Sequence, residues 1–333
     1  MWRYVLGVLA CIASVPVNAA DFDIANALNR KNLSNFAPRG RSDIINYLID
    51  GRDELVKAGI NNPNRFYHFI AQISTETGGF ARLDENMNYS RARLLQIFPK
   101  RVSRSDAARV AGDPIRTANW VYGARLGNRG RNTNDGWNYR GSGYLQLTGR
   151  ANFIQRGKLI GVKIEDQPER VRDVKDGLST TLSYWNSKSI NTICDTGTIV
   201  DVRRAVNGGV IGLKEAKLWF ALAQKHFKPS LEGGLEGAED IEAADELVLS
   251  AISDLLSSLG YKAESGLESA ADFNLLSDAI RKFQRNNGID EGPPGGRLES
   301  AEDVELSPDL ISALTDPQNI VAERERAVRR SQR

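Results

Sequence analysis

The chain is poor in the residues that form covalent cross-links and transition-metal sites. Its 333 residues include only two cysteines and two histidines. Cys11 lies in an N-terminal segment that we expect to be removed, which leaves Cys194 without a partner for an internal disulfide. His68 and His226 stand in no cluster with the spacing of metal ligands. We therefore expect no metal and no cofactor, and a zinc peptidase or amidase is disfavoured.

A strong excess of either charge is also absent. Lysine and arginine number 44 and aspartate and glutamate 42, so the net charge is only +2. This balance gives no sign of a nucleic-acid partner. An apolar fraction of 41% with 26% charged residues is typical of a globular protein. We expect a monomer with one large domain and one small one.

The N-terminus has the layout of a secretory signal peptide. Trp2-Arg3 supplies a positive charge, residues 4–15 form an apolar run, and Val17-Asn18-Ala19 places small residues where a signal peptidase would cut. The apolar run is too short to cross a membrane as a helix. We predict that residues 1–20 are removed and that the mature protein is secreted or periplasmic in a bacterium, without a membrane anchor. A buried N-terminal helix is the alternative.

The mature chain divides into four segments. Residues 21–228, where short helical patterns alternate with Gly- and Asn-rich loops, form the main domain. Residues 229–246 carry seven acidic residues and no basic one, which indicates a flexible linker. Residues 247–316 form a small helical unit and residues 317–333 a basic tail. Strand patterns are sparse, so the predicted fold class is mainly α.

Three short helices are expected in the small unit. Apolar residues recur at helical spacing from Val248 to Leu259 and again from Leu276 to Phe283, and a glycine follows each pattern. Ser307-Pro308 has the form of an N-cap followed by proline in the first turn, and it begins the third helix.

One helix of the main domain is expected to present a carboxylate. Asn62-Pro63 is a helix start, and the apolar positions from Phe66 to Ile73 follow at i, i+3, i+4 and i+7. Glu76 lies three residues further on, in the last turn before Gly78-Gly79. Partial burial and the negative end of the helix dipole would raise the pKa of Glu76, so that it could donate a proton to a leaving oxygen. A structural glutamate is the alternative.

A second acid follows nine residues later in a loop. Glu85, with Asp84 as its rival, could lie across a glycosidic bond from Glu76. Hydrolysis of a glycoside by direct attack of water needs an acid and a base roughly 6.5–9.5 Å apart. A helix end followed by a turn of this length can reach that separation. Taken alone, the pair is also compatible with ordinary surface acids.

Four ordered blocks between about residues 60 and 210 resemble glycoside hydrolase family 19, the family of chitinases and phage endolysins. They are FIAQISTETGGF at 69–80, ENMNYS at 85–90 with FPKR at 98–101, YGARLGN at 122–128 with DGWNYRGSGYLQLTGRANF at 135–153, and AVNGG at 205–209. The resemblance implies a two-lobed, mainly helical, lysozyme-like domain with a substrate cleft between the lobes.

The resemblance also implies an inverting mechanism and assigns roles. Glu76 is then the general acid, Glu85 the general base, and Thr148 helps to hold the attacking water. The positions that fall in the substrate-binding blocks are Gln146, Asn152, Asn207, Tyr122, Trp137, Tyr139 and Arg140. Aromatic faces suit sugar rings and amides suit hydroxyls, although core packing is the alternative for at least two of Trp137, Tyr139 and Tyr144.

The chain departs from the family pattern in three places. Thr75 stands where a histidine commonly precedes the catalytic glutamate, which would tune or reduce activity. An arginine that often follows the Asn207-Gly208-Gly209 block is replaced by Lys214 and Lys217. The paired cysteines of plant chitinases are absent, which favours the bacterial or phage branch.

The small C-terminal unit resembles a peptidoglycan-binding module in two short stretches, residues 259–261 and 279–289. Such a module would tether the protein to the cell wall and raise its local concentration there. We therefore expect cleavage of β-1,4 bonds in N-acetylglucosamine-containing polymers, with peptidoglycan favoured over chitin.

Two other hypotheses stay open. A catalytically weak or inactive protein, dulled at Thr75, would bind cell-wall glycan without cutting it. A peptidase or amidase would use Cys194 as a nucleophile with His226. Neither of those two residues lies in a recognisable signature, and Cys194 is compatible with a small buried residue.

Overall fold

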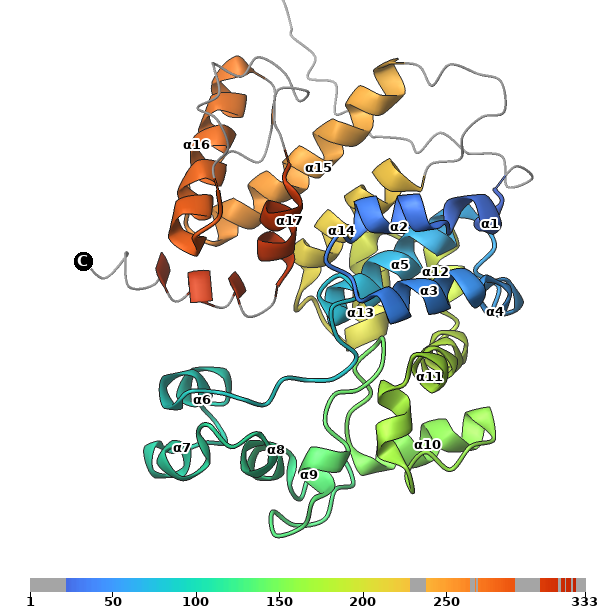
Figure 1. Ribbon diagram of the computed structural model, residues 1–333, viewed down its shortest axis with the longest axis vertical. Coiled ribbons are helices and arrows are strands. Elements are labelled where there is room, and N and C mark those ends of the chain that lie inside the picture. The colour runs from blue at the N-terminus through green and yellow to red at the C-terminus, as the bar shows by residue number, and fades with distance from the viewer. Residues whose placement is uncertain are drawn as a thin grey trace, which may run out of the picture.

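A computed structural model describes residues 22–227, 238–263, 267, 269–290, 306–316, 319–320, 322–324 and 326–327 (Figure 1). Within these residues the regular structure is helical, and β-pairing is limited to two isolated bridges. The predicted mainly α fold is therefore confirmed. The expected signal peptide at residues 1–20 lies outside the described part of the chain. No helix in the described part is long and apolar enough to cross a membrane.

Two lobes make up the main domain, one above the other in Figure 1. The upper lobe holds α1 (Ile24–Ala27), α2 (Arg30–Phe36), α3 (Ser42–Asp50), α4 (Arg52–Lys57), α5 (Pro63–Thr77), α12 (Ile190–Thr196), α13 (Ile199–Asn207) and α14 (Leu213–His226). The lower lobe holds α6 (Arg91–Ile97), α7 (Arg104–Val110), α8 (Pro114–Tyr122), α9 (Asp135–Asn138), α10 (Arg150–Ile160) and the 3-10 helix η1 (Pro168–Arg172). Helix α11 (Val174–Ser187) returns the chain to the upper lobe and packs on α3, α10 and α12.

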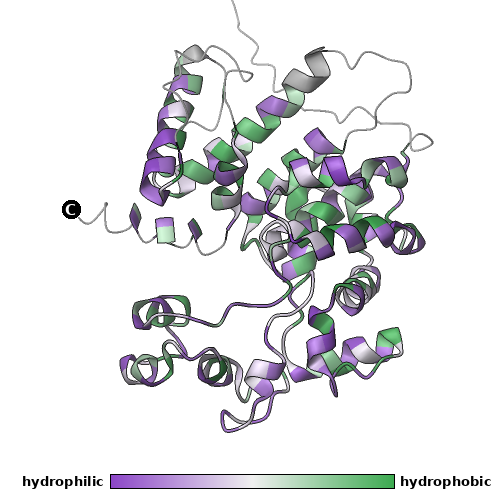
Figure 2. Cartoon of the chain, viewed as in Figure 1, coloured by the Kyte–Doolittle hydropathy of each residue, from purple (hydrophilic) through white to green (hydrophobic). Residues whose placement is uncertain are grey.

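Helix α5 is the centre of the upper lobe, and its limits follow from its sequence. The side chain of Asn62 caps the first turn by accepting from the backbone N–H of Arg65, and Pro63 occupies the first helical position. The apolar positions of α5 are buried and pack against α14 (Figure 2). Gly78 ends the helix with φ +65°, the left-handed conformation that favours glycine.

The lower lobe has its own small cores. One lies among α6, α7 and α8 and is built from Met87, Leu94, Val102, Ala107, Val110, Ala118 and Val121. Another lies between α10 and η1 and is built from Tyr139, Phe153, Ile164 and Val171. Among the described residues these cores are separate from the upper one, and the connecting segments and α11 link the two lobes.

Backbone hydrogen bonds join two of these connecting segments. The N–H of Gly143 donates to the carbonyl of Leu83 at 2.7 Å, and the N–H of Glu85 donates to the carbonyl of Gly141 at 2.8 Å. Ser142 also exchanges hydrogen bonds with Leu147 in both directions. We call residues 83–85 and 141–147 the interlobe ladder. It fixes where the candidate base Glu85 lies relative to the loop that follows α9.

The C-terminal unit contains the three predicted helices, α15 (Ala238–Ser258), α16 (Ala270–Asn287) and α17 (Pro308–Thr315). Ser307 caps α17 and Gly288 ends α16 with φ +65°. The predicted linker at 229–246 needs a correction, because residues 238–246 are the first turns of α15. Alanine and glutamate, which are frequent there, favour helix. Residues 228–237 lie outside the described part.

This unit is docked on the main domain. Helix α15 packs along α14, and a single buried apolar cluster contains residues of α5 and α14 together with Val248 and Leu310. Lys225 pairs with Asp245 across the contact, and Lys214 Nζ donates to the Asp254 carbonyl at 2.8 Å. The segment predicted as a tail takes part as well.

Glu323, from the segment predicted as a basic tail, is fully buried. It accepts a hydrogen bond from the hydroxyl of Tyr261 at 2.7 Å and from Asn287 at 3.0 Å. Arg324 pairs with Glu215 of α14 at 3.3 Å. Part of the predicted tail is therefore packed, since Glu323 finds buried polar partners.

Candidate active site

Glu76 lies in the last turn of α5, as predicted, and its side chain is 19% exposed. The Nη1 of Arg203, from α13, donates to Glu76 Oε1 at 2.7 Å. Arg203 is itself buried, and its Nη1 also donates to Gln72 Oε1 at 3.1 Å and its Nε to the carbonyl of Ile211 at 2.8 Å. Glu76 is thus held by a fixed cation at the edge of the apolar core.

Arg203 is a residue of the site that the sequence pattern does not single out. Burial and the helix end were the expected influences on Glu76, and no cation was expected beside it. Arg203 precedes the Asn207-Gly208-Gly209 block, whereas the family pattern often places an arginine after it, where this chain has lysines. The position of Arg203 between the buried Val202 and Val206 was the one available sign that it faces inward.

Glu85 is held from two sides. The hydroxyl of Tyr122 lies 2.8 Å from both carboxylate oxygens, and the N–H of Gly141 donates to Oε2 at 3.3 Å. Burial raises the pKa of Glu85, and the bonds from Tyr122 and Gly141 and the charge of Arg140 oppose that rise. A carboxylate with a raised pKa is a stronger base once it has lost its proton.

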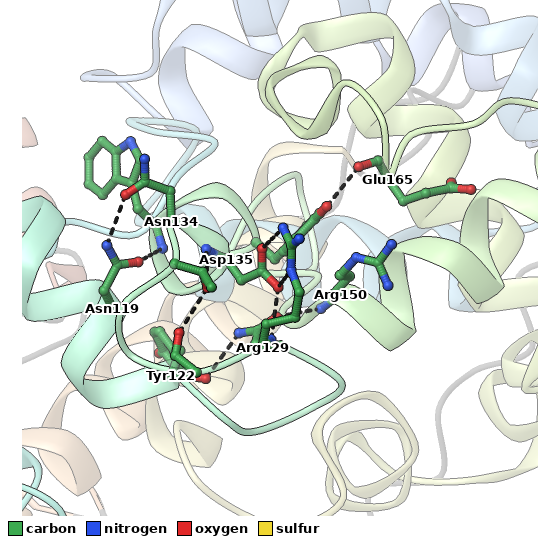
Figure 3. Close-up of polar contacts among 12 residues, drawn as sticks. Asn119, Tyr122, Arg129, Asn134, Asp135, Arg150 and Glu165 are labelled. Atoms are coloured by element: carbon green, nitrogen blue, oxygen red, sulfur yellow. Dashed lines mark hydrogen bonds and ion pairs between the residues drawn. The ribbon is translucent and has the colours of Figure 1, made fainter.

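Tyr122 therefore supports Glu85 instead of presenting a free face to substrate. It is the last residue of α8, and the Asn128 side chain donates to its carbonyl at 3.0 Å. The same Asn128 accepts from the N–H of Arg150 at the start of α10 at 2.8 Å. Figure 3 shows this region, where the loop between α8 and α9 is closed by an ion pair of Arg129 with the buried Asp135 at 2.7 Å.

The rival acid Asp84 has a different partner. Arg140 is 6% exposed and donates from Nη2 to Asp84 Oδ2 at 2.9 Å. Its guanidinium also lies 3.7 Å from the ring centre of Trp137, whose carbonyl accepts from Nη1 at 2.9 Å. Arg140, which stacks on Trp137, thus holds Asp84 in an ion pair. Glu85 is therefore the better candidate for the base.

Three predicted polar residues line one pocket. Gln146, Thr148 and Asn152 border a cavity of about 430 Å³ between the interlobe ladder, α10 and α11. Thr148 Oγ1 donates to the Gln146 carbonyl at 2.9 Å, and Asn152 Nδ2 donates to the Thr148 carbonyl at 2.7 Å. Because its hydrogen is engaged, the Thr148 oxygen is left to accept a hydrogen bond from a water molecule.

Gly141 brings Glu85 and this pocket together. A Cβ at position 141 would lie 2.3 Å from Gln146 Oε1 and 3.2 Å from Glu85 Oε2. Both side chains therefore converge on the space that a larger residue would fill. A glycine at this point is required by close approach, as the glycine-rich sequence suggested.

Two other predicted residues have structural contacts instead. Tyr139 is 5% exposed, packs on Phe153 at 5.1 Å between ring centres, and donates its hydroxyl to the carbonyl of Glu165 at 2.8 Å. Tyr144 is fully buried. The structure does not bring Tyr139 to the site, and core packing, the alternative reading, describes both tyrosines.

Asn207 is exposed at the end of α13, but its side chain is engaged by the chain that follows. Its Nδ2 donates to the carbonyl of Ile211 at 3.0 Å, and its Oδ1 accepts from the N–H of Gly209 at 3.0 Å. Asn207 thus shapes the loop whose Ile211 carbonyl also receives Arg203. Thr75 is buried and donates its hydroxyl to the carbonyl of Ala71 at 2.8 Å.

The cysteine–histidine hypothesis finds no support in the structure. Cys194 is buried, and burial raises the pKa of its thiol to about 12, so it is not a thiolate at neutral pH. Burial lowers the pKa of His226 to about 4. Among the residues that the structure describes, no group of three or more acidic, histidine or cysteine side chains could hold a metal ion.

Comparison with known proteins gives the family. No protein-family model matches the chain. A protein of Haemophilus influenzae described as a glycosyl hydrolase family 19 domain-containing protein is 37% identical over 172 residues, which cover 51% of this chain and 84% of that protein. The crystal structure of chitinase C from Streptomyces griseus aligns with a TM-score of 0.39 at 18% identity, over 61% of this chain and 79% of that one. On the strength of the sequence relative, the chain belongs to glycosyl hydrolase family 19 and is a glycoside hydrolase.

Proposed function

We propose that this protein hydrolyses β-1,4 bonds in N-acetylglucosamine-containing polymers by inversion, with Glu76 as general acid and Glu85 as general base. One observation carries the proposal. The two carboxylates have opposite surroundings, since Glu76 lies beside the cation Arg203 whereas Glu85 is partly buried with a raised pKa and held by Tyr122. Two carboxyl groups with different environments suit an acid–base pair. The family resemblance assigns the acid role to Glu76, and Arg203 would stabilise the carboxylate that forms when Glu76 gives up its proton.

The proposed step divides the proton work between the two residues. Glu76 gives its proton to the glycosidic oxygen as the carbon–oxygen bond breaks, and Arg203 stabilises the carboxylate that remains. Glu85 takes a proton from a water molecule, which attacks the sugar carbon from the opposite face. Thr148, with its lone pairs free, accepts a hydrogen bond from that water.

Peptidoglycan is the favoured polymer, with chitin as the other. The weak resemblance of the C-terminal unit to a wall-binding module supports this choice. Because that unit packs on α14, it would hold the wall at a fixed place relative to the catalytic domain, in contrast to a module on a flexible tether. We also propose export through the N-terminal signal peptide, which N-terminal sequencing of the secreted protein would test.

The test compares three variants on soluble peptidoglycan strands and chitin oligomers. Glu76→Gln and Glu85→Gln should each lower turnover by about 10²–10⁴-fold without loss of folding. Asp84→Asn is the matched control and should retain most activity, because Asp84 is engaged with Arg140. Proton NMR of the first product should show the α-anomer. Full activity of Glu76→Gln, or a β-anomer, would contradict the proposal.

A second candidate is a glycan-binding protein without turnover, and Thr75 is the observation that favours it. The Thr75 hydroxyl bonds to its own helix, so it supplies no partner to Glu76 in place of the histidine that the family commonly has. This candidate predicts that the protein pellets with wall or chitin and releases no reducing ends. The same assays therefore separate the two functions.

A further inference from the structure

Arg156 is a buried cation without an anionic partner. It belongs to α10 and is 6% exposed. Its Nη1 donates to the Ser187 hydroxyl oxygen at 3.2 Å, and its guanidinium carbon lies 4.8 Å from the ring centre of Tyr184. Its Nε is buried and has no hydrogen-bond partner among the described residues, and no carboxylate there forms an ion pair with Arg156.

The surroundings of Arg156 form part of the pocket that holds Thr148 and Asn152. Asn152 and Arg156 are four residues apart on α10 and so lie on the same face of that helix. The lining residues include two cations, Arg156 and the exposed Lys188, and no acidic side chain. The pocket therefore complements an anion, and a buried arginine presents a fork of donors that fits a carboxylate.

The same pocket is electrostatically linked to the candidate acid. Tyr184 lines it, and donates its hydroxyl to the carbonyl of Val206 at 2.9 Å. Burial raises the pKa of Tyr184, Arg156 opposes that rise, and the charge of Glu76 adds to it. Tyr184 thus lies within range of the charges of both Arg156 and Glu76.

Burial of this charge has a cost for the fold. Desolvation lowers the pKa of Arg156 below its ordinary value, because the charged form loses contact with water. A buried charge without an opposite partner destabilises a protein. Functional sites are one place where proteins tolerate such a loss of stability.

From this geometry we propose that Arg156 binds a carboxylate of the substrate, and that it selects peptidoglycan strands over neutral chitin. The proposal rests on the proposed function and names the substrate class of the same site. Two carboxylates are chemically possible. One belongs to the peptide stem of an intact strand, and the other is the lactyl carboxylate, which is free only where the stem has been removed.

Binding measurements in the Glu76→Gln background test the proposal without depending on turnover. The ligands are soluble strands that carry stems, strands freed of stems by an amidase, and chitin hexamer. Arg156→Met should weaken binding to one or both kinds of carboxylate-bearing strand by about 10- to 100-fold. Binding to chitin hexamer should stay within about twofold, since a neutral ligand offers no ion pair to lose. The strand that loses affinity identifies the carboxylate.

Two further variants separate recognition from folding. Arg156→Lys keeps the charge but loses the fork, and should weaken the same strands by about tenfold. Arg116→Met removes an exposed arginine of α8, outside the pocket lining, and should change none of the three affinities. The melting temperature of Arg156→Met should be unchanged or higher.

An equal loss of affinity for all three ligands, or no loss for any, would overturn the assignment of Arg156. If Arg156→Met does not fold, the selectivity of Arg156→Lys decides in its place. Failure of the proposed function would give a different experimental result. In that case the unmodified protein releases no reducing ends from either polymer, while the selective effect of Arg156 on binding persists.

Discussion

The hydroxyl of Tyr122 lies 2.8 Å from each carboxylate oxygen of Glu85. Its single hydrogen therefore stabilises the charged form of Glu85 and opposes the rise in pKa that burial causes. This contact joins the end of α8 to the interlobe ladder, and it makes Tyr122 a positioning residue for the candidate base.

Replacing Tyr122 by phenylalanine should move the acidic limb of the pH profile to higher pH. The lost bond raises the pKa of Glu85 further, and a base must be deprotonated to act. A hydrogen bond to a charged group contributes about 1.5–3 kcal/mol, which corresponds to roughly one to two pH units. The profile of kcat/KM on a soluble oligosaccharide measures the shift. Tyr89→Phe is the control, because Tyr89 packs on Phe98 and should leave the limb in place.

Glu85→Gln should raise the melting temperature at high pH. The pKa of Glu85 is higher in the folded than in the unfolded chain, so the fold favours its protonated form. Its contribution to stability is fully present below the unfolded pKa and is lost as the pH rises through the folded pKa. Glutamine has no charge to bury, so the variant should melt above the unmodified protein at pH 8 and show no such advantage at pH 4. Thermal unfolding across this range would reveal the opposite order if the assignment were wrong.

Arg203→Met should impair the site and the fold together. It removes the partner of Glu76 and leaves that partly buried carboxylate uncompensated, a loss of about 3–5 kcal/mol for fully buried pairs and less here. We expect turnover to fall at least about tenfold, with Arg203→Lys intermediate. A double-mutant cycle with Glu76→Gln measures the coupling, and a coupling of zero would show that the 2.7 Å contact is unimportant.

Gly79→Ala should cost more stability than Gly112→Ala. Both glycines have positive φ, +69° and +78°, so each alanine meets the same backbone strain. A Cβ at Gly79 would also lie 2.7 Å from Cη2 of Trp219, whereas nothing lies within 4 Å at Gly112. We expect about 1–2 kcal/mol of destabilisation from the backbone at both positions. Overpacking should add about 1–3 kcal/mol at Gly79 alone, and chemical denaturation would measure the difference.

Because the C-terminal unit is docked on the main domain, proteolysis between the two should not separate them. A protease site introduced between residues 228 and 237 should yield two fragments that stay together on gel filtration. The buried cluster shared by α14 and α15 and the Lys225–Asp245 ion pair hold them. Separation of the fragments in low salt would instead favour a module on a tether.

Local features of the sequence predicted much of this fold. The start of α5 at Asn62-Pro63, its buried stripe and its end at Gly78 are set by neighbouring residues, and so is the cap at Ser307. These signals act within one or two helical turns, where propensity and capping decide the conformation. The flexible linker was predicted too long because acidic composition does not distinguish a solvated helix from a coil.

Contacts between distant parts of the chain were harder to foresee. Arg203 meets Glu76 across 127 positions and Tyr122 meets Glu85 across 37, and no local pattern records such pairs. Tyr139 looked like a sugar platform because its sequence block is rich in glycine and aromatics. Its ring instead belongs to the small core next to α10, where it packs on Phe153.

The interlobe ladder bears on how far the two candidate catalytic carboxylates can move apart. Glu76 is bound to Arg203 in the upper lobe, whereas Glu85 belongs to the interlobe ladder and accepts a hydrogen bond from Tyr122 of the lower lobe. A few backbone hydrogen bonds around Gly141 thus set how Glu85 is placed relative to the lobe that carries Glu76. Under the proposed function, a rotation of one lobe against the other would change the separation of the two carboxylates, so we expect the stiffness of these bonds to affect which polymers fit.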